Sequence, residues 1–190
     1  MEFKGSQTEK NLMAAFAGES QARTRYSFFA SASRKEGFEQ IADIFQETSD
    51  NEKEHAKLFF DLLRDGEARI TATYPAGTIG TTAANLAAAA EGEKLEWGTL
   101  YPQFADTAEK EGFLDVANTF RHVAKVEAYH ERRFRKLLSN VENGSVFKRT
   151  GKTFWKCRNC GNIYEGAEAP EKCPVCDHPK AFYELWCENY

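Results

Sequence analysis

Hydrophobic residues recur along the chain at spacings of three and four, which predicts long amphipathic helices. Such patterns cover about residues 6–34, 38–63, 82–110 and 114–141. One face of the first helix is expected to carry Leu12, Phe16, Arg23 and Tyr26. A stretch rich in Pro, Gly and Thr at 72–80 separates the second helix from the third and predicts a crossover connection.

The helical pattern repeats with an offset of 75 residues. KEGF occurs at 35–38 and again at 110–113. The stripe of the second helix is Ile41, Phe45, Thr48, Glu52, His55, Phe59 and Leu62, and that of the fourth is Val116, Phe120, Val123, Glu127, His130, Phe134 and Leu137. Two copies of a helical hairpin predict a four-helix bundle.

One part of the repeat departs from this offset. Tyr26 and Tyr101 are 75 residues apart, whereas Glu19 and Glu93 are 74 residues apart. One residue has therefore been gained between the glutamate and the tyrosine of the second copy.

Carboxylates and imidazoles interrupt the apolar stripes of all four helices. These residues are Glu19, Glu52, His55, Glu93, Glu96, Glu127 and His130. A lone Glu-x-x-His is usually a solvated pair, but here two of them lie in register within a repeated stripe, each sharing one helix face. His122 and His178 lack such partners, and we expect a surface and a structural role for them.

Five carboxylates that point at one bundle axis need positive charge nearby. Burial of a single unpaired carboxylate already costs several kcal/mol. Two divalent ions would balance most of this charge, and a carboxylate-rich site with one imidazole per metal suits iron or manganese. Tyr26 and Tyr101 are compatible with a simple core role, but their symmetric placement predicts hydrogen bonds to glutamate ligands.

Four of the five cysteines form two CxxC pairs near the C-terminus: Cys157, Cys160, Cys173 and Cys176. This pattern predicts a tetrahedral four-sulfur site, and alone it does not separate zinc from iron. The surrounding segment, rich in Cys, Pro, Gly and aromatic residues, predicts turns and short strands around a metal. Cys187 lies outside the pairs and is expected to be a free thiol.

Composition narrows the class of protein. The chain has 190 residues and a net charge of −4 without a basic stripe, which argues against a nucleic-acid partner. Its longest weakly polar run, at 83–90, is too short to span a membrane, and the first ten residues lack the apolar core of a signal peptide. We therefore expect a cytoplasmic protein, in which paired CxxC motifs favour metal over disulfides.

Together these features resemble rubrerythrin across essentially the whole chain. The matching motifs are AGESQAR at 17–23, NEKEH at 51–55, EGEKLEW at 91–97, VEAYHE at 126–131 and a tail that resembles rubredoxin. The resemblance implies a mainly α fold. A ferritin-like four-helix bundle with a crossover (1–146) would precede a small β/turn rubredoxin-like domain (152–190) whose aromatic core is Trp155, Tyr164 and Phe182.

The resemblance also implies two iron sites. The seven Glu and His residues named above match the family's di-iron ligands, and the four paired cysteines match its FeS4 ligands. The ligand set and the repeat single out Glu96, whose repeat equivalent is Ala22. We expect Glu96 to bind one iron in the diferric state and to give way to His55 in the diferrous state.

The function implied by the resemblance is that of a non-haem peroxidase in oxidative-stress defence. Hydrogen peroxide would be reduced to water with electrons from NAD(P)H, delivered by a reductase or rubredoxin through the FeS4 centre, in a head-to-tail homodimer. A ferroxidase or iron-storage protein is one alternative, although its electrons come from incoming Fe²⁺ and it needs no FeS4 tail. A helical binding module with structural zinc is the other.

Overall fold

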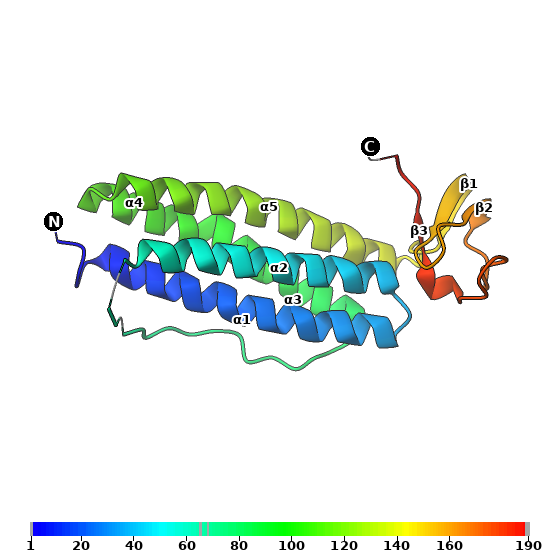
Figure 1. Cartoon of the computed structure of the whole chain (residues 1–190), viewed down its shortest axis with the longest axis horizontal. Helices are drawn as coiled ribbons and strands as arrows, with labels where there is room; N and C mark the ends of the chain where they lie inside the picture. The colour runs from blue at the N-terminus through cyan, green and yellow to red at the C-terminus, as the bar shows by residue number, and fades with distance from the viewer. Residues whose placement is uncertain (1, 65, 68, 189–190) are drawn as a thin grey trace.

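The computed structural model describes residues 2–64, 66–67 and 69–188, which form a helical bundle followed by a small three-stranded sheet (Figure 1). The bundle elements are α1 (Gln7–Lys35), α2 (Glu39–Leu62), α3 (Thr82–Leu95), the π-helix η1 (Glu96–Leu100), α4 (Tyr101–Glu111) and α5 (Leu114–Glu142). The C-terminal elements are β1 (Lys148–Cys157), β2 (Ile163–Glu168), the 3-10 helix η2 (Lys180–Phe182) and β3 (Tyr183–Leu185). The mainly α bundle with a small C-terminal β/turn region is as predicted.

The repeated KEGF motif builds the same helix end twice. Gly37 and Gly112 have φ angles of +84° and +90°, a left-handed conformation that glycine adopts without steric cost. Just after each glycine, the backbone N–H of Phe38 or Phe113 donates a hydrogen bond to a carbonyl five residues back. The repeat therefore sets two equivalent reversals, α1 to α2 and α4 to α5.

The apolar stripes pack toward the bundle axis largely as the spacing predicts. On α2 and α5 every stripe residue is buried except the last of each, Leu62 and Leu137, which are half-buried. The face predicted for α1 was wrong at one position. Arg23 is exposed and the buried stripe passes through Ala22 instead, because the 3-4 spacing places position 22 between Glu19 and Tyr26.

The long connection from α2 to α3 runs along the outside of α1, from one end of the bundle to the other (Figure 1). The Tyr74 hydroxyl donates a 2.8 Å hydrogen bond to the backbone oxygen of Ala14 on α1. At the far end, Thr81 caps α3 by accepting from the Ala84 N–H. Among the described residues, no helix is both long and apolar enough to cross a bilayer.

The C-terminal sheet is antiparallel, with strand order β2-β1-β3. Its core contains fully buried Trp155 together with Tyr183, Cys157 and Cys173. The prediction that Tyr164 belongs to this core was wrong, because Tyr164 is exposed and Tyr183 fills the interior instead. On the other side of β1, Cys157 pairs with Tyr183 of β3, so Tyr183 shares a sheet face with the buried Trp155 and Cys157.

The sheet sits against the end of the bundle where α1 turns into α2. The Arg158 guanidinium donates to Asp43 of α2 at 2.6 Å and also pairs with Glu184 of β3. Phe38 and Phe147 stack with ring planes 6° apart and centroids 6.1 Å apart. These contacts fix the four cysteines at one end of the bundle.

Candidate metal centres

The carboxylates and imidazoles of the stripes meet inside the bundle in two groups of four, and within each group one ligand atom from every residue lies within 4.8 Å of the others. The first group is Glu19, Glu52, His55 and Glu127. The second group is Glu52, Glu93, Glu127 and His130. Glu52 and Glu127 belong to both groups.

The two shared carboxylates each reach both imidazoles. His55 Nδ1 lies 2.8 Å from Glu52 Oε2 and 2.8 Å from Glu127 Oε1. His130 Nδ1 lies 3.2 Å from Glu52 Oε1 and 2.8 Å from Glu127 Oε2. Each carboxylate therefore turns one oxygen toward each imidazole, which is the arrangement needed to bridge two metal ions.

Two tyrosines hold the remaining carboxylates from opposite helices. The Tyr26 hydroxyl of α1 donates to Glu93 Oε1 of α3, and the Tyr101 hydroxyl of α4 donates to Glu19 Oε1 of α1. Both tyrosine side chains are almost fully buried. Each hairpin thus orients a carboxylate of the other.

Burial and mutual repulsion shift the ionisation of the cluster. Burial raises the pKa of Glu19 well above its usual value, and neighbouring carboxylates raise it further. Burial together with the charge of Glu52 raises the pKa of Glu93 to about 8. Burial alone would lower the pKa of His55, but hydrogen bonds and charge from Glu127 and Glu52 outweigh it and raise the value to about 10. The protein alone balances this charge only by holding protons.

The chemistry of the cluster fits a pair of metal ions. Several buried atoms make no well-aligned hydrogen bond with the described residues, although some of them lie within 3.2 Å of one another: Glu19 Oε2, Glu52 Oε1, Glu93 Oε2, both carboxylate oxygens of Glu127 and His130 Nδ1. An unpaired buried polar group is costly, so atoms that converge without pairing indicate a common cation. A set of hard oxygens with one imidazole per position suits iron.

Glu96 stands apart from both groups. It is half-buried at the start of η1, and within the described residues it does not join either set of four ligand atoms. Burial raises its pKa well above the usual value, nearby carboxylates raise it further, and the charge of Arg25 opposes them. The Glu96 carboxylate is therefore close enough for the charges of the cluster to act on it, while His55 occupies the position beside Glu19.

The π-helix accounts for the break in the repeat. A π-helical turn accommodates one extra residue within a helix, and η1 lies between Glu93 and Tyr101, the interval in which the second copy has gained a residue. The third helix was predicted to be continuous from about 82 to 110, and the structure shows η1 in its middle. The 74-residue offset was the signal for it.

We expect Tyr101→Phe to weaken ferrous binding at the position beside Glu19 by about 10- to 100-fold, the usual effect of losing a hydrogen bond to a ligand. The change removes the hydroxyl that orients Glu19 and leaves the ring in place. Equilibrium titration of metal-free protein with Fe²⁺ measures it, and exposed Tyr129→Phe is the control. Unchanged affinity in Tyr101→Phe would contradict an orienting role.

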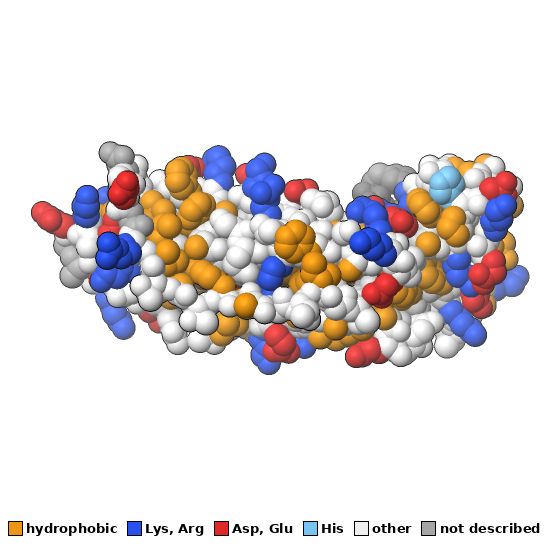
Figure 2. Space-filling model, turned by 90° about the horizontal axis from the view of Figure 1, so that it is seen from below, with side chains coloured by type: hydrophobic (Ala, Val, Ile, Leu, Met, Phe, Trp, Pro, Cys, Tyr) orange, Lys and Arg blue, Asp and Glu red, His pale blue; other side chains and the backbone are white. Residues whose placement is uncertain are grey.

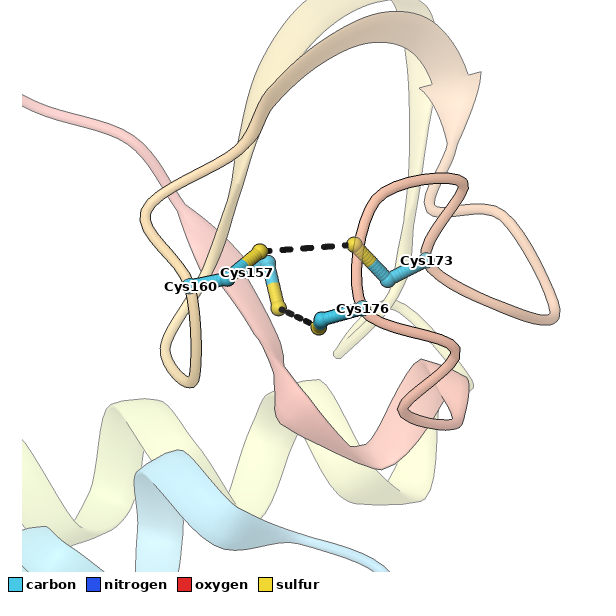
Figure 3. A group of neighbouring side chains, drawn as sticks. All are labelled: Cys157, Cys160, Cys173 and Cys176. Atoms are coloured by element: carbon cyan, nitrogen blue, oxygen red, sulfur yellow. Dashed lines mark hydrogen bonds between the residues drawn. The ribbon is translucent and has the colours of Figure 1, made fainter.

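The four paired cysteines also converge. Figure 3 shows their side chains pointing at one another from two facing turns. The Sγ atoms of Cys157 and Cys176 are 3.8 Å apart, and those of Cys160 and Cys173 are 3.6 Å apart. A tetrahedral ion with sulfur ligands at about 2.3 Å holds them about 3.8 Å apart, so the spacing fits one such ion.

The turn that carries Cys173 and Cys176 favours thiolate, whereas the pKa values of Cys157 and Cys160 in the other turn are raised. The pKa of Cys157 is raised mainly by burial, and that of Cys160 is raised, against an opposing backbone hydrogen bond, by burial and the neighbouring thiols. Burial alone would raise the pKa of Cys173, but hydrogen bonds from the Tyr183 hydroxyl and from the backbone outweigh it and lower the value to about 6. His178 bonds the Cys176 carbonyl through Nδ1 and packs on Phe182, which agrees with a structural role. Two other residues lie away from both metal groups: His122 is exposed, and Cys187 is an exposed free thiol.

Comparison with known proteins gives matches along nearly the whole chain. A family model described as Rubrerythrin matches residues 10–138, and one described as the rubredoxin-like domain of rubrerythrin matches residues 155–184. A rubrerythrin of Porphyromonas gingivalis is 59% identical over 187 residues, covering 98% of this chain and 94% of the relative. A rubrerythrin of Nitratidesulfovibrio vulgaris is 52% identical, covering 98% of each chain.

Solved structures agree with these matches. Fully reduced, all-ferrous nigerythrin has a TM-score of 0.65 and 31% identity, and the match covers 97% of this chain and 91% of that one. A Desulfovibrio desulfuricans bacterioferritin has a TM-score of 0.55 at 16% identity, covering 74% and 87%. At this low identity, the second match supports the ferritin-like fold alone.

Proposed function

The chain belongs to the rubrerythrin family, and on that basis we propose that this iron-centre oxidoreductase is a peroxidase that reduces hydrogen peroxide to water. The family carries a di-iron carboxylate site and a four-cysteine rubredoxin-like site, and the two clusters described above supply donors for both. The observation that carries the proposal is this pairing of a redox-active sulfur site with a di-iron cluster on one chain.

In this proposal the buried cluster is the catalytic site. Glu19 and His55 would hold one iron, Glu93 and His130 would hold the other, and Glu52 and Glu127 would be shared by both. When bound and reduced, the two irons would supply the two electrons needed to cleave the O–O bond of peroxide. Glu96 would serve as the additional ligand in the oxidised state.

The chain's own residues position the ligands and keep out water. The hydroxyls of Tyr26 and Tyr101 fix Glu93 and Glu19. Apolar clusters around Phe45 and Phe134 on one side, and around Phe59 and Phe120 on the other, close the bundle above and below the site. A site closed in this way strengthens the electrostatic interactions inside it.

The four-cysteine site is proposed as the point at which electrons enter, since zinc there would be redox-silent. An external donor, a rubredoxin or an NAD(P)H-dependent reductase, would reduce it. A ferroxidase, in contrast, takes electrons from incoming Fe²⁺ and needs no such site. Cysteines that bind metal instead of forming disulfides are typical of a reducing compartment, and we therefore propose that the protein works in the cytoplasm.

Distance favours transfer between two chains. The cysteines lie at the end of the bundle near Glu39, whereas His55 is sixteen residues further along α2, a helical rise of about 24 Å. A head-to-tail homodimer would bring the cysteine site of one chain beside the di-iron site of its partner. We therefore include this dimer in the proposal.

We expect the chemically reduced protein to be reoxidised at least tenfold faster by hydrogen peroxide than by O₂. Stopped-flow mixing of dithionite-reduced, iron-loaded protein with each oxidant at equal concentration measures the two rates. Manganese-loaded or metal-free protein serves as the control for reaction outside the iron sites. An equal or faster reaction with O₂ would favour an oxidase or ferroxidase instead.

We expect Glu96→Ala to bind two ferrous ions but to slow peroxide turnover roughly tenfold or more, because the diferric product loses an anionic oxygen ligand. Glu91→Ala, an exposed change on the same helix, is the control. Crystal structures of the oxidised and reduced wild-type protein test the ligand exchange directly. Identical ligation by Glu96 and His55 in both states would contradict it.

A further inference from the structure

A cavity of about 250 Å³ lies between α1 and the α3–η1–α4 helix, with the crossover segment 72–75 across it. Figure 2 views the molecule from the side of this segment and shows hydrophobic side chains gathered over the middle of the bundle, with a basic side chain among them. The Tyr74 ring lies against Gly18, where a Cβ would be 3.7 Å from Tyr74 Cε1. The bond from Tyr74 to Ala14 holds the segment in place.

The cavity is polar at one end and apolar at the other. The helices run antiparallel, since Arg25 lies against Gly92 and Tyr101 bonds Glu19. Gln21, Arg25 and Glu96 therefore lie toward one end. The other end is apolar and is lined by Ala14, Ala15, Leu100 and Phe104.

Two polar atoms at the polar end are buried without a hydrogen-bond partner among the described residues. They are Gln21 Oε1, an acceptor, and Arg25 Nε, a donor. They lie one helical turn apart on α1, and both residues line the cavity. A buried unpaired acceptor and donor side by side fit a ligand that offers both an O–H and a lone pair.

The cavity adjoins the di-iron cluster. Glu96 and Tyr101 line it, and the hydroxyl of Tyr101 reaches into the cluster by bonding Glu19. Hydrogen peroxide, with two heavy atoms, would leave most of this volume and all of its apolar end without a partner. An apolar protein cavity of about 150 Å³ already accepts benzene, so a cavity of this size accommodates an organic group of several carbons.

We propose that the cavity binds small organic hydroperoxides, ROOH. The peroxide group lies at the Gln21 and Arg25 end, and the organic group lies against the apolar end. The proposal rests on the peroxidase function above and widens its substrate class. The O–O bond breaks, two electrons from the reduced di-iron site and two protons are taken up, and the products are the alcohol ROH and water.

The test compares tert-butyl hydroperoxide with hydrogen peroxide as oxidants of the reduced, iron-loaded protein in stopped flow. The variant Ala14→Phe fills the apolar end, and Ala88→Phe, an exposed alanine of α3, is the matched control. We expect the two peroxides to react within tenfold of each other in the wild type. In Ala14→Phe the rate with tert-butyl hydroperoxide should fall at least tenfold relative to that with hydrogen peroxide, with no such change in Ala88→Phe.

A binding measurement tests the cavity without turnover. tert-Butyl alcohol has the same organic group and no O–O bond, and saturation-transfer NMR on the full iron-loaded chain reports its contact with protein. We expect the transferred signal in the wild type and in Ala88→Phe, and at least a fivefold loss in Ala14→Phe. A signal unaffected by Ala14→Phe would overturn the proposed location.

The outcomes separate the two levels of the proposal. Suppose that hydrogen peroxide reoxidises the protein but that tert-butyl hydroperoxide reacts more than tenfold more slowly in the wild type, or that Ala14→Phe leaves the ratio of the two rates unchanged. Either result refutes the organic hydroperoxide site and leaves the peroxidase function standing. If neither peroxide reoxidises the protein, the peroxidase function itself is refuted.

Discussion

Glu127→Ala is expected to remove both irons from the bundle while the four-cysteine site keeps its own. Glu127 places one oxygen 2.8 Å from His55 Nδ1 and the other 2.8 Å from His130 Nδ1, and it belongs to both ligand groups. Its loss opens both metal positions at once. Metal centres supply several kcal/mol of rate enhancement, so peroxide reduction should fall at least ~10³-fold.

Iron analysis and visible absorption measure this result together. The expected values are one iron per chain and an unchanged sulfur-to-iron absorption band. The bundle should stay folded by circular dichroism, because the change removes one of several buried carboxylates that repel one another. Glu19→Ala is the matched control, because Glu19 belongs to one group only and its loss should release a single iron. Retention of both irons in Glu127→Ala would refute the bridging assignment.

The bundle and its metal cluster were predictable because the same pattern of apolar residues, glutamate and histidine occurs in both halves of the repeat. A single Glu-x-x-His carries little information, but Glu52-His55 and Glu127-His130 occupy the same steps of two aligned stripes. Helical periodicity then fixes the direction in which each side chain points. The structure brings these four residues to one place.

The π-helix was not predicted, although its signal was present. Hydrophobic spacing does not separate an α-helix from one that contains a single wider turn, so residues 82–110 read as one helix. The offset between Glu93 and Tyr101 in the second copy, one residue longer than between Glu19 and Tyr26, marked the insertion. Sequence comparison within the chain located a feature that periodicity alone misses.

The cavity residues could not be found from the sequence, because they meet only through tertiary packing. Gln21 and Arg25 read as ordinary polar positions of α1, and Tyr74 lies in a segment without periodicity. Only the path of the crossover along α1 covers these residues. Tyr183 of the small domain was missed for a related reason, because the sequence does not show that β3 pairs with β1 and places Tyr183 opposite Cys157.

Cys160→Ser is expected to lower NADH-driven peroxide turnover at least ~100-fold, because an iron–sulfur centre with a changed ligand set either has a shifted reduction potential or loses its metal. The single reaction of pre-reduced protein with peroxide should remain. Cys160 Sγ lies 3.6 Å from that of Cys173, at the end of the bundle, and touches none of the carboxylate ligands. The change therefore separates electron delivery from peroxide chemistry.

Two measurements on the same variant establish this separation. Steady-state turnover with NADH, a rubredoxin reductase and rubredoxin reports electron delivery, and stopped-flow reoxidation of dithionite-reduced protein reports the di-iron reaction. Cys187→Ser, at an exposed free thiol, is the matched control and should leave both rates unchanged. If Cys160→Ser sustains normal turnover, electrons reach the bundle directly and the four-cysteine site has a structural role. If it abolishes the single reaction as well, the sulfur site also supports the fold of the di-iron cluster, and circular dichroism of the bundle will show the loss.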